Sequence, residues 1–213
     1  SIDYPVAPEK KYPTPLKQTA AALAYLQQQA KRLHIDTSFF ILAGDSGGAH
    51  IAAQTANIVY NNSYAKLIGI TPTLNPSQLA AQLLYCGPYD IDHVSTDGPF
   101  GGFMQTVLWS YSGSKNHKEN ELFQTASVLN YIEKAYPPSF ISSGNGDPLL
   151  SHSKALARKL VQSNVKVDTL FFPQEMQPAL PHEYQFNLDT EAGKLALNQS
   201  LRFLRDLQQN SKL

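Results

Sequence analysis

Residues 39–48 contain the most informative stretch of the chain, Phe-Phe-Ile-Leu-Ala-Gly-Asp-Ser-Gly-Gly. The first four residues form a short, continuously apolar run, which is typical of a parallel strand covered by helices on both faces. A G-x-S-x-G pentapeptide follows, and then a segment rich in small residues from Ala49 to Tyr60. This order predicts a strand, a sharp turn and a helix, with the serine held at the carboxyl end of a sheet.

The pentapeptide consists of Gly44, Asp45, Ser46, Gly47 and Gly48. We expect glycine on either side of the serine because a β-carbon there would meet neighbouring backbone. The following helix turns its free N–H groups toward the serine, so the Gly47 N–H is expected to donate to an oxyanion. The competing interpretation is a glycine-rich turn with a helix-capping serine, because such pentapeptides occur by chance in several per cent of chains. The flanking strand and helix favour a nucleophile.

Strands and helices alternate along the rest of the chain. Further strands are predicted at 82–86, 140–143 and 165–172, and helices at 16–33, 49–60, 153–162 and 190–207. Such alternation predicts an α/β fold with a mostly parallel sheet between two helical layers. We therefore expect one domain over residues 1–213, with a small cap element around residues 93–125.

The composition excludes several classes of function. The chain has 213 residues, 17 basic and 17 acidic side chains and a pI near 7, so no positive field would attract nucleic acid or anionic lipid. No apolar run approaches the roughly 20 residues that span a bilayer. The single cysteine, Cys86, cannot form an internal disulfide, and we expect it in the core of a cytoplasmic protein.

A serine hydroxyl needs a base before it can act as a nucleophile. Of the six histidines, His182 is the favoured base because it follows a predicted strand, in the loop at 173–183, at the sheet edge where Ser46 is expected. His50 lies one turn into the predicted helix, where its geometry is poor, so we expect a packing or surface role. The remaining four lie in polar stretches and are expected to be solvated: His34, His93, His117 and His152.

Asp147 is the candidate acid that would orient the imidazole of His182. It follows the predicted strand at 140–143, within a Gly-Asn-Gly-Asp-Pro turn. The competing interpretation is a turn aspartate that caps the next helix.

The sequence contains no motif for a cofactor or a metal. The glycines form neither a dinucleotide-binding fingerprint nor a phosphate-binding P-loop, and the histidines lack metal-ligand spacing, so we expect no cofactor and no metal.

Four stretches carry a resemblance to a known family. Residues 3–9, Asp-Tyr-Pro-Val-Ala-Pro-Glu, resemble its D-Y-R-L-A-P-E segment, and residues 44–48 resemble its G-D-S-A-G-G turn. Residues 147–149 match its D-P-L, and residues 181–184, Pro-His-Glu-Tyr, resemble its P-H-x-F. The chain thus resembles the esterases and lipases related to hormone-sensitive lipase, within the α/β-hydrolase fold. The departures, which are Pro5, Gly47 and Tyr184, remove no catalytic group.

The resemblance implies a serine ester hydrolase that acts on small esters, with short to medium acyl chains, through an acyl-enzyme. It implies Ser46 as nucleophile, His182 as base, Asp147 as acid and the Gly47 N–H in the oxyanion hole; their chain order is that of α/β-hydrolases. We expect activity to rise with pH through roughly 6 to 7. Two alternatives stay open: a non-catalytic member that binds a small hydrophobic ligand, and an amidase or acyltransferase with the same triad.

The family also carries an H-G-G-G oxyanion loop upstream of the first of these stretches, and the chain has no such loop. We therefore expect these residues to be the C-terminal portion of a longer protein, with the N-terminal strands missing. The strand before Ser46 would then be an open sheet edge, which a strand-complementing chain or a homo-oligomer could cover. Whether this chain alone is active stays open, as does an upstream signal peptide.

Overall fold

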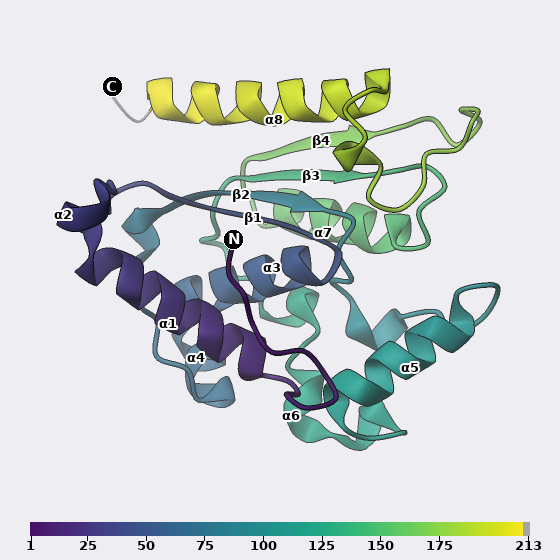
Figure 1. Cartoon of the computed structure of the whole chain (residues 1–213), viewed down its shortest axis with the longest axis horizontal. Helices are drawn as coiled ribbons and strands as arrows, with labels where there is room; N and C mark the ends of the chain where they lie inside the picture. Colours follow the sequence, from purple (N-terminus) through teal and green to yellow (C-terminus); the bar gives the residue numbers. More distant parts are fainter. Residues whose placement is uncertain (211–213) are drawn as a thin grey trace.

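The computed structural model describes residues 1–210, and its centre is one parallel sheet (Figure 1). The four strands lie in the order β1-β2-β3-β4 and all pairs are parallel. They are β1 (Phe40–Asp45), β2 (Leu79–Tyr85), β3 (Ser139–Ser143) and β4 (Val167–Phe171). The register pairs Asp45 with Tyr85 and Ser143 with Phe171, so the carboxyl ends of the strands form one edge. The start of α3, which directly follows β1, and the loops after β3 and β4 therefore meet there.

Helices cover both faces of the sheet. In Figure 1, α8 (Glu191–Asn210) lies on one side, and α1 (Thr14–Gln28), α3 (Ser46–Tyr60) and α7 (Leu150–Gln162) lie on the other. The shorter helices are α2 (Ala30–Leu33), α4 (Asn62–Ile68), α5 (Gly101–Ser112) and α6 (Glu121–Gln124). No helix within residues 1–210 has the length and apolarity needed to span a bilayer.

The core has two halves because neighbouring strand residues point to opposite faces. Phe140 packs toward α8, where its ring centroid lies 6.2 Å from that of Phe203. Ile141 belongs to the other half, together with Ala53 of α3 and Leu156 of α7. The predicted three-layer α/β architecture is confirmed.

Several predicted boundaries differ from the structure. The helix expected at 16–33 is interrupted at Gln29, and α2 beyond it buries no side chain, so no packing holds the two segments in one helix. The helix predicted at 49–60 does end at Tyr60, but the Asn61 side chain then accepts the Tyr64 N–H and starts α4, which was not predicted. Strand β1 extends to Asp45 because Gly44 and Asp45 still pair with β2.

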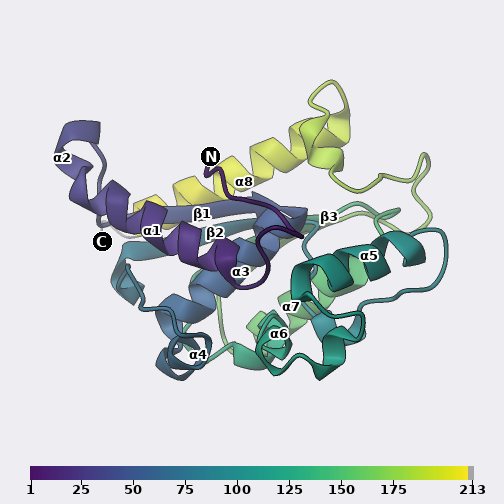
Figure 2. The same cartoon turned by 60° about the horizontal axis from the view of Figure 1, so that its bottom comes forward.

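The segment expected to form a cap contains α5 and α6. In Figure 1 both helices lie farther from the sheet than α3 and α7, and Figure 2 shows them from that side, in front of α7. Helix α5 buries only Gly101, Leu108 and Ser112 and exposes large apolar side chains, among them Phe103 and Val107. A cap role for this segment stays a prediction.

Candidate active site

Ser46 is the first residue of α3 and directly follows β1. Its backbone has a φ of 47°, a left-handed conformation that is costly for a residue with a side chain and that is found mainly at functional turns. A β-carbon on Gly44 would lie 2.3 Å from the carbonyl carbon of Gly48. A β-carbon on Gly48 would meet no heavy atom within 4 Å. The prediction that a β-carbon would meet neighbouring backbone is therefore confirmed at Gly44 and wrong at Gly48.

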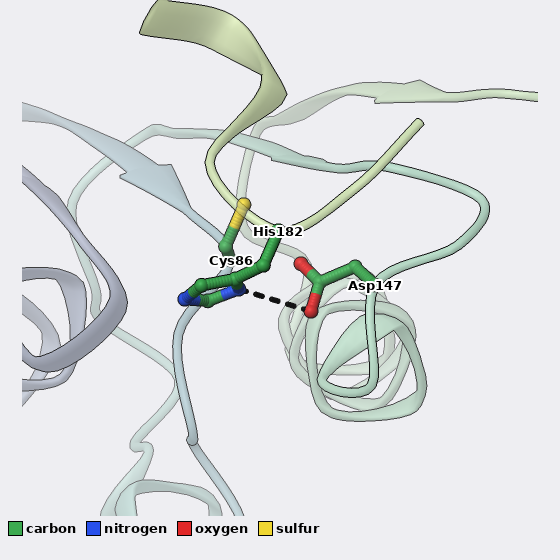
Figure 3. Close-up of side chains that lie close together, drawn as sticks. All are labelled: Cys86, Asp147 and His182. Carbon is green, nitrogen blue, oxygen red and sulfur yellow. Dashed lines mark hydrogen bonds and ion pairs between the residues drawn. The ribbon is translucent and has the colours of Figure 1, made fainter. Parts of the chain in front are cut away.

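The three candidate catalytic side chains meet at the carboxyl edge of the sheet. The Ser46 Oγ lies 3.0 Å from the Nε2 of His182, and the His182 Nδ1 lies 3.1 Å from the Oδ1 of Asp147. Figure 3 shows the second of these contacts. Ser46 comes from the start of α3, Asp147 from the turn after β3 and His182 from the loop after β4. Residues that are 136 positions apart in the sequence thus share one hydrogen-bonded row.

Asp147 is fixed in place by its neighbours. Its side chain is fully buried; Oδ2 accepts the Ser143 hydroxyl at 2.7 Å and Oδ1 accepts the Leu149 N–H at 2.8 Å. Burial alone would raise the pKa of Asp147, but the hydrogen bonds from His182, Leu149 and Ser143 outweigh it and hold the pKa below its ordinary value. Asp147 therefore stays ionised, and its bond to Leu149 also organises the turn before α7.

His182 is held in one tautomer. An ionised carboxylate accepts hydrogen bonds and donates none. The Nδ1 of His182 therefore carries the proton that is shared with Asp147, and the lone pair of Nε2 faces the Ser46 hydroxyl. The hydrogen bond to Asp147 raises the pKa of His182 above 6.5, burial opposes the rise, and the charges of Asp147, Glu183 and Asp45 add to it. The arrangement can take a proton from Ser46 and stabilise the imidazolium that results.

The other histidines lie away from this row. His50 is buried and donates its Nε2–H to the Ala126 carbonyl at 2.7 Å, and burial lowers its pKa to about 4. His34 and His93 are exposed and His117 partly so, but His152 is buried and its Nδ1 accepts the Asp90 N–H at 3.2 Å. The expectation that His152 is solvated was wrong. Its spacing of four from Leu156, and of eight from Leu160, places it on the inner face of α7 and could have revealed this.

Cys86 was expected to be a core residue, and the structure places it near Asp147 and His182 (Figure 3). Ligand atoms of Cys86, Asp147 and His182 lie within 4.8 Å of one another, a donor set that zinc accepts. Burial raises the pKa of the Cys86 thiol to about 12, so the thiolate that a metal requires is disfavoured. Asp147 and His182 are also bonded to each other. The geometry favours a neutral thiol beside a hydrogen-bonded pair, and a metal-free site stays our prediction.

A cavity of about 370 Å³ opens beside Gly47. Its walls come from the N-terminal segment, α3 and α5, and most of the lining side chains are apolar. They include Tyr4, Val6, Ile51, Met104 and Leu108, and Gly47 lines the cavity with its backbone. Of the residues of the turn at 44–48, Gly47 lines the cavity, so the cavity adjoins the residue that follows the candidate nucleophile.

Residues 1–180 match the sequence model of a family described as having the α/β-hydrolase fold. The chain belongs to the α/β-hydrolase-fold family. The match covers the elements that carry Ser46 and Asp147. It confirms the resemblance to the esterases related to hormone-sensitive lipase.

Solved structures of other α/β hydrolases share this fold. Esterase B from Lactobacillus Rhamnosis superposes with a TM-score of 0.78 at 19% identity, over 98% of this chain and 66% of its own. EstE1, a thermostable carboxylesterase cloned from a metagenomic library, superposes with a TM-score of 0.74 at 22% identity, over 96% of this chain and 67% of its own. A bacterial heroin esterase superposes with a TM-score of 0.70 at 22% identity, over 96% of this chain and 63% of its own. The chain therefore spans about two thirds of the length of these proteins.

Proposed function

We propose that this α/β hydrolase supplies the nucleophile, base and acid of a serine carboxylic ester hydrolase. The observation that carries the proposal is the row Ser46–His182–Asp147, with heavy-atom separations of 3.0 and 3.1 Å. Family membership and the esterase names of the structural neighbours support the reaction class.

The proposed reaction has two acyl-transfer steps. The Ser46 oxygen attacks the ester carbonyl while Nε2 of His182 takes its proton, and Asp147 stabilises the imidazolium. His182 then returns the proton to the departing alcohol, which leaves an acyl group on Ser46. Water, deprotonated by His182, attacks this acyl-enzyme; the bond to the Ser46 oxygen breaks, His182 returns the proton to that oxygen, and the carboxylic acid is released.

Two features support esters with a modest apolar group as substrates. Gly47 follows the nucleophile, the position whose N–H donates to the oxyanion in this fold. The apolar cavity of about 370 Å³ next to it is near the lower end of the volumes typical of small-molecule sites. We infer that it accommodates short to medium acyl chains.

A fluorophosphonate probe tests the proposal directly, because it phosphonylates only activated serines. We expect one adduct in the intact mass, located at Ser46 by peptide mapping and slowed by excess butyrate ester. Heat-denatured protein, in which the triad is lost, is the control and should give no adduct. Labelling at another serine, or none in the folded chain, would contradict the proposal for this chain.

The pH dependence gives a second prediction. The hydrogen bond from Nδ1 to the Asp147 carboxylate stabilises charged His182 more than neutral His182, so its pKa lies above 6.5 and the base loses its proton at a higher pH. Since only neutral His182 can accept the serine proton, kcat/KM should rise with pH through a midpoint above 6.5. Glu183→Gln removes a carboxylate 3.9 Å from Nε2 and should lower the midpoint. A flat profile from about pH 5 to about pH 8 would exclude His182 as the base.

A further inference from the structure

Cys86 lies where three segments of the site come together. It directly follows β2, and its backbone has a φ of 54°, the left-handed region that a residue with a side chain rarely adopts. Its N–H donates to the Ser142 carbonyl at 2.9 Å, which fixes its backbone against β3. Its side chain is completely buried. The strained backbone therefore turns the thiol inward at the level of the candidate triad.

The sulfur faces both loops that supply the triad. The thiol donates to the Oε1 of Gln185 at 3.6 Å, three residues after His182. Burial and the nearby Asp147 carboxylate raise the pKa of the thiol, while hydrogen bonds from the backbone N–H groups of Glu183 and Gly144 to the sulfur lower it. Glu183 adjoins the histidine, and Gly144 begins the turn that carries Asp147. One atom thus contacts the base loop and the acid turn together.

These two segments already form a closely packed pair. The Gly146 N–H donates to the Leu180 carbonyl at 2.9 Å, and the Leu180 N–H donates to the Asn145 side chain at 2.8 Å. A β-carbon on Gly144 would lie 2.3 Å from the Leu180 oxygen, so no other side chain fits between them. The Cys86 sulfur lies beside this pair, because the ligand atoms of Cys86, Asp147 and His182 are all within 4.8 Å of one another. The Asp147 side chain is fully buried and that of His182 is 30% exposed, so the sulfur adjoins the buried end of their hydrogen bond, and a less polar environment strengthens a charged hydrogen bond.

We propose that Cys86 is a positioning residue of the triad, whose neutral thiol holds the loop of His182 against the turn of Asp147 and keeps water from their hydrogen bond. The inference rests on the proposed function of the same site. Cys86 itself exchanges no proton or bond with the substrate, and the raised pKa of its thiol disfavours a nucleophilic role.

The experiment compares Cys86→Ala, Cys86→Ser and a matched control, Ser139→Ala. Ser139 is also fully buried and also loses one heavy atom, but it lies at the amino end of β3, where its hydroxyl donates to the Pro137 carbonyl. Two quantities are measured for each variant: kcat and KM with p-nitrophenyl butyrate, and the pKa of His182 from an NMR titration of its ring protons.

We expect Cys86→Ala to lower kcat about tenfold with little change in KM, because water enters and the imidazole loses its fixed orientation. The pKa of His182 should fall toward 6.5, because the bond to Asp147 is the largest cause of its rise. Cys86→Ser retains a donor and should recover part of both effects. Ser139→Ala should leave both quantities at the wild-type values.

Unchanged kcat and an unchanged His182 pKa in Cys86→Ala would overturn the inference and leave Cys86 a core residue. If Cys86→Ala fails to fold, kcat and the His182 pKa are compared between Cys86→Ser and the wild type, and unchanged values overturn the inference in the same way. If the wild-type chain gives no fluorophosphonate adduct, the proposed function fails for this chain. The NMR titration needs no turnover, so it still shows whether Cys86 sets the contact between Asp147 and His182.

Discussion

Alanine in place of Ser46 is expected to lower kcat/KM toward a small ester by about 10⁵–10⁶-fold. Ser46 supplies the oxygen that forms the acyl-enzyme, and His182 has no other hydroxyl at 3.0 Å from which to take a proton among the described residues. The remaining activity would come from binding and the oxyanion donor alone. The mutation removes one oxygen from a half-buried residue, so the fold should be unaffected.

The measurement is a kinetic assay on p-nitrophenyl butyrate, with circular dichroism and Tm recorded on the same samples. The matched control is Ser38→Ala, at an exposed serine just before the amino end of the strand that delivers Ser46. The control should keep wild-type kinetics and the fluorophosphonate adduct, and Ser46→Ala should lose both. If Ser46→Ala retains kcat/KM within tenfold of the wild type, Ser46 is not the nucleophile.

The sequence predicted those parts of the fold that depend on local patterns. The apolar run at 39–42 and the small residues after Ser46 predicted the junction of β1 and α3, because a buried strand and a sharp turn have few compatible sequences. Ser46, Asp147 and His182 each follow a predicted strand, which placed all three at one sheet edge because parallel strands share their carboxyl end. The hydrogen bonds between them required the structure.

The misses have different causes. The burial of His152 was readable from its helical spacing to Leu156 and Leu160, and the start of α4 depends on one local side-chain cap at Asn61. Cys86 was predicted to lie within a strand, but the chain leaves β2 one residue earlier and turns in a left-handed conformation. That turn brings its sulfur to Asp147 and His182, and no spacing in the sequence contains this information.

Gly44→Ala is expected to destabilise the protein by about 4 kcal/mol or more, the range reached when a mutation forces backbone apart. The new β-carbon would lie 2.3 Å from the Gly48 carbon, 2.4 Å from its oxygen and 2.6 Å from the Ala49 nitrogen. All three are backbone atoms of α3, so no side-chain rotation can relieve the clash. The start of α3 must move away from β1, and Ser46 moves with it.

Gly48→Ala is the matched control, because the same atom is added four residues later, in the first turn of α3, into open space. Alanine is about 0.5–1 kcal/mol better than glycine inside a helix, so this variant should be as stable as the wild type or slightly more. Urea unfolding followed by circular dichroism measures the stability of both variants, and fluorophosphonate labelling reports whether Ser46 is still in position to react. Equal unfolding midpoints for the two variants would show that the close contact between Gly44 and Gly48 does not hold the turn together. A large difference, with labelling lost only in Gly44→Ala, would show that this contact fixes the nucleophile.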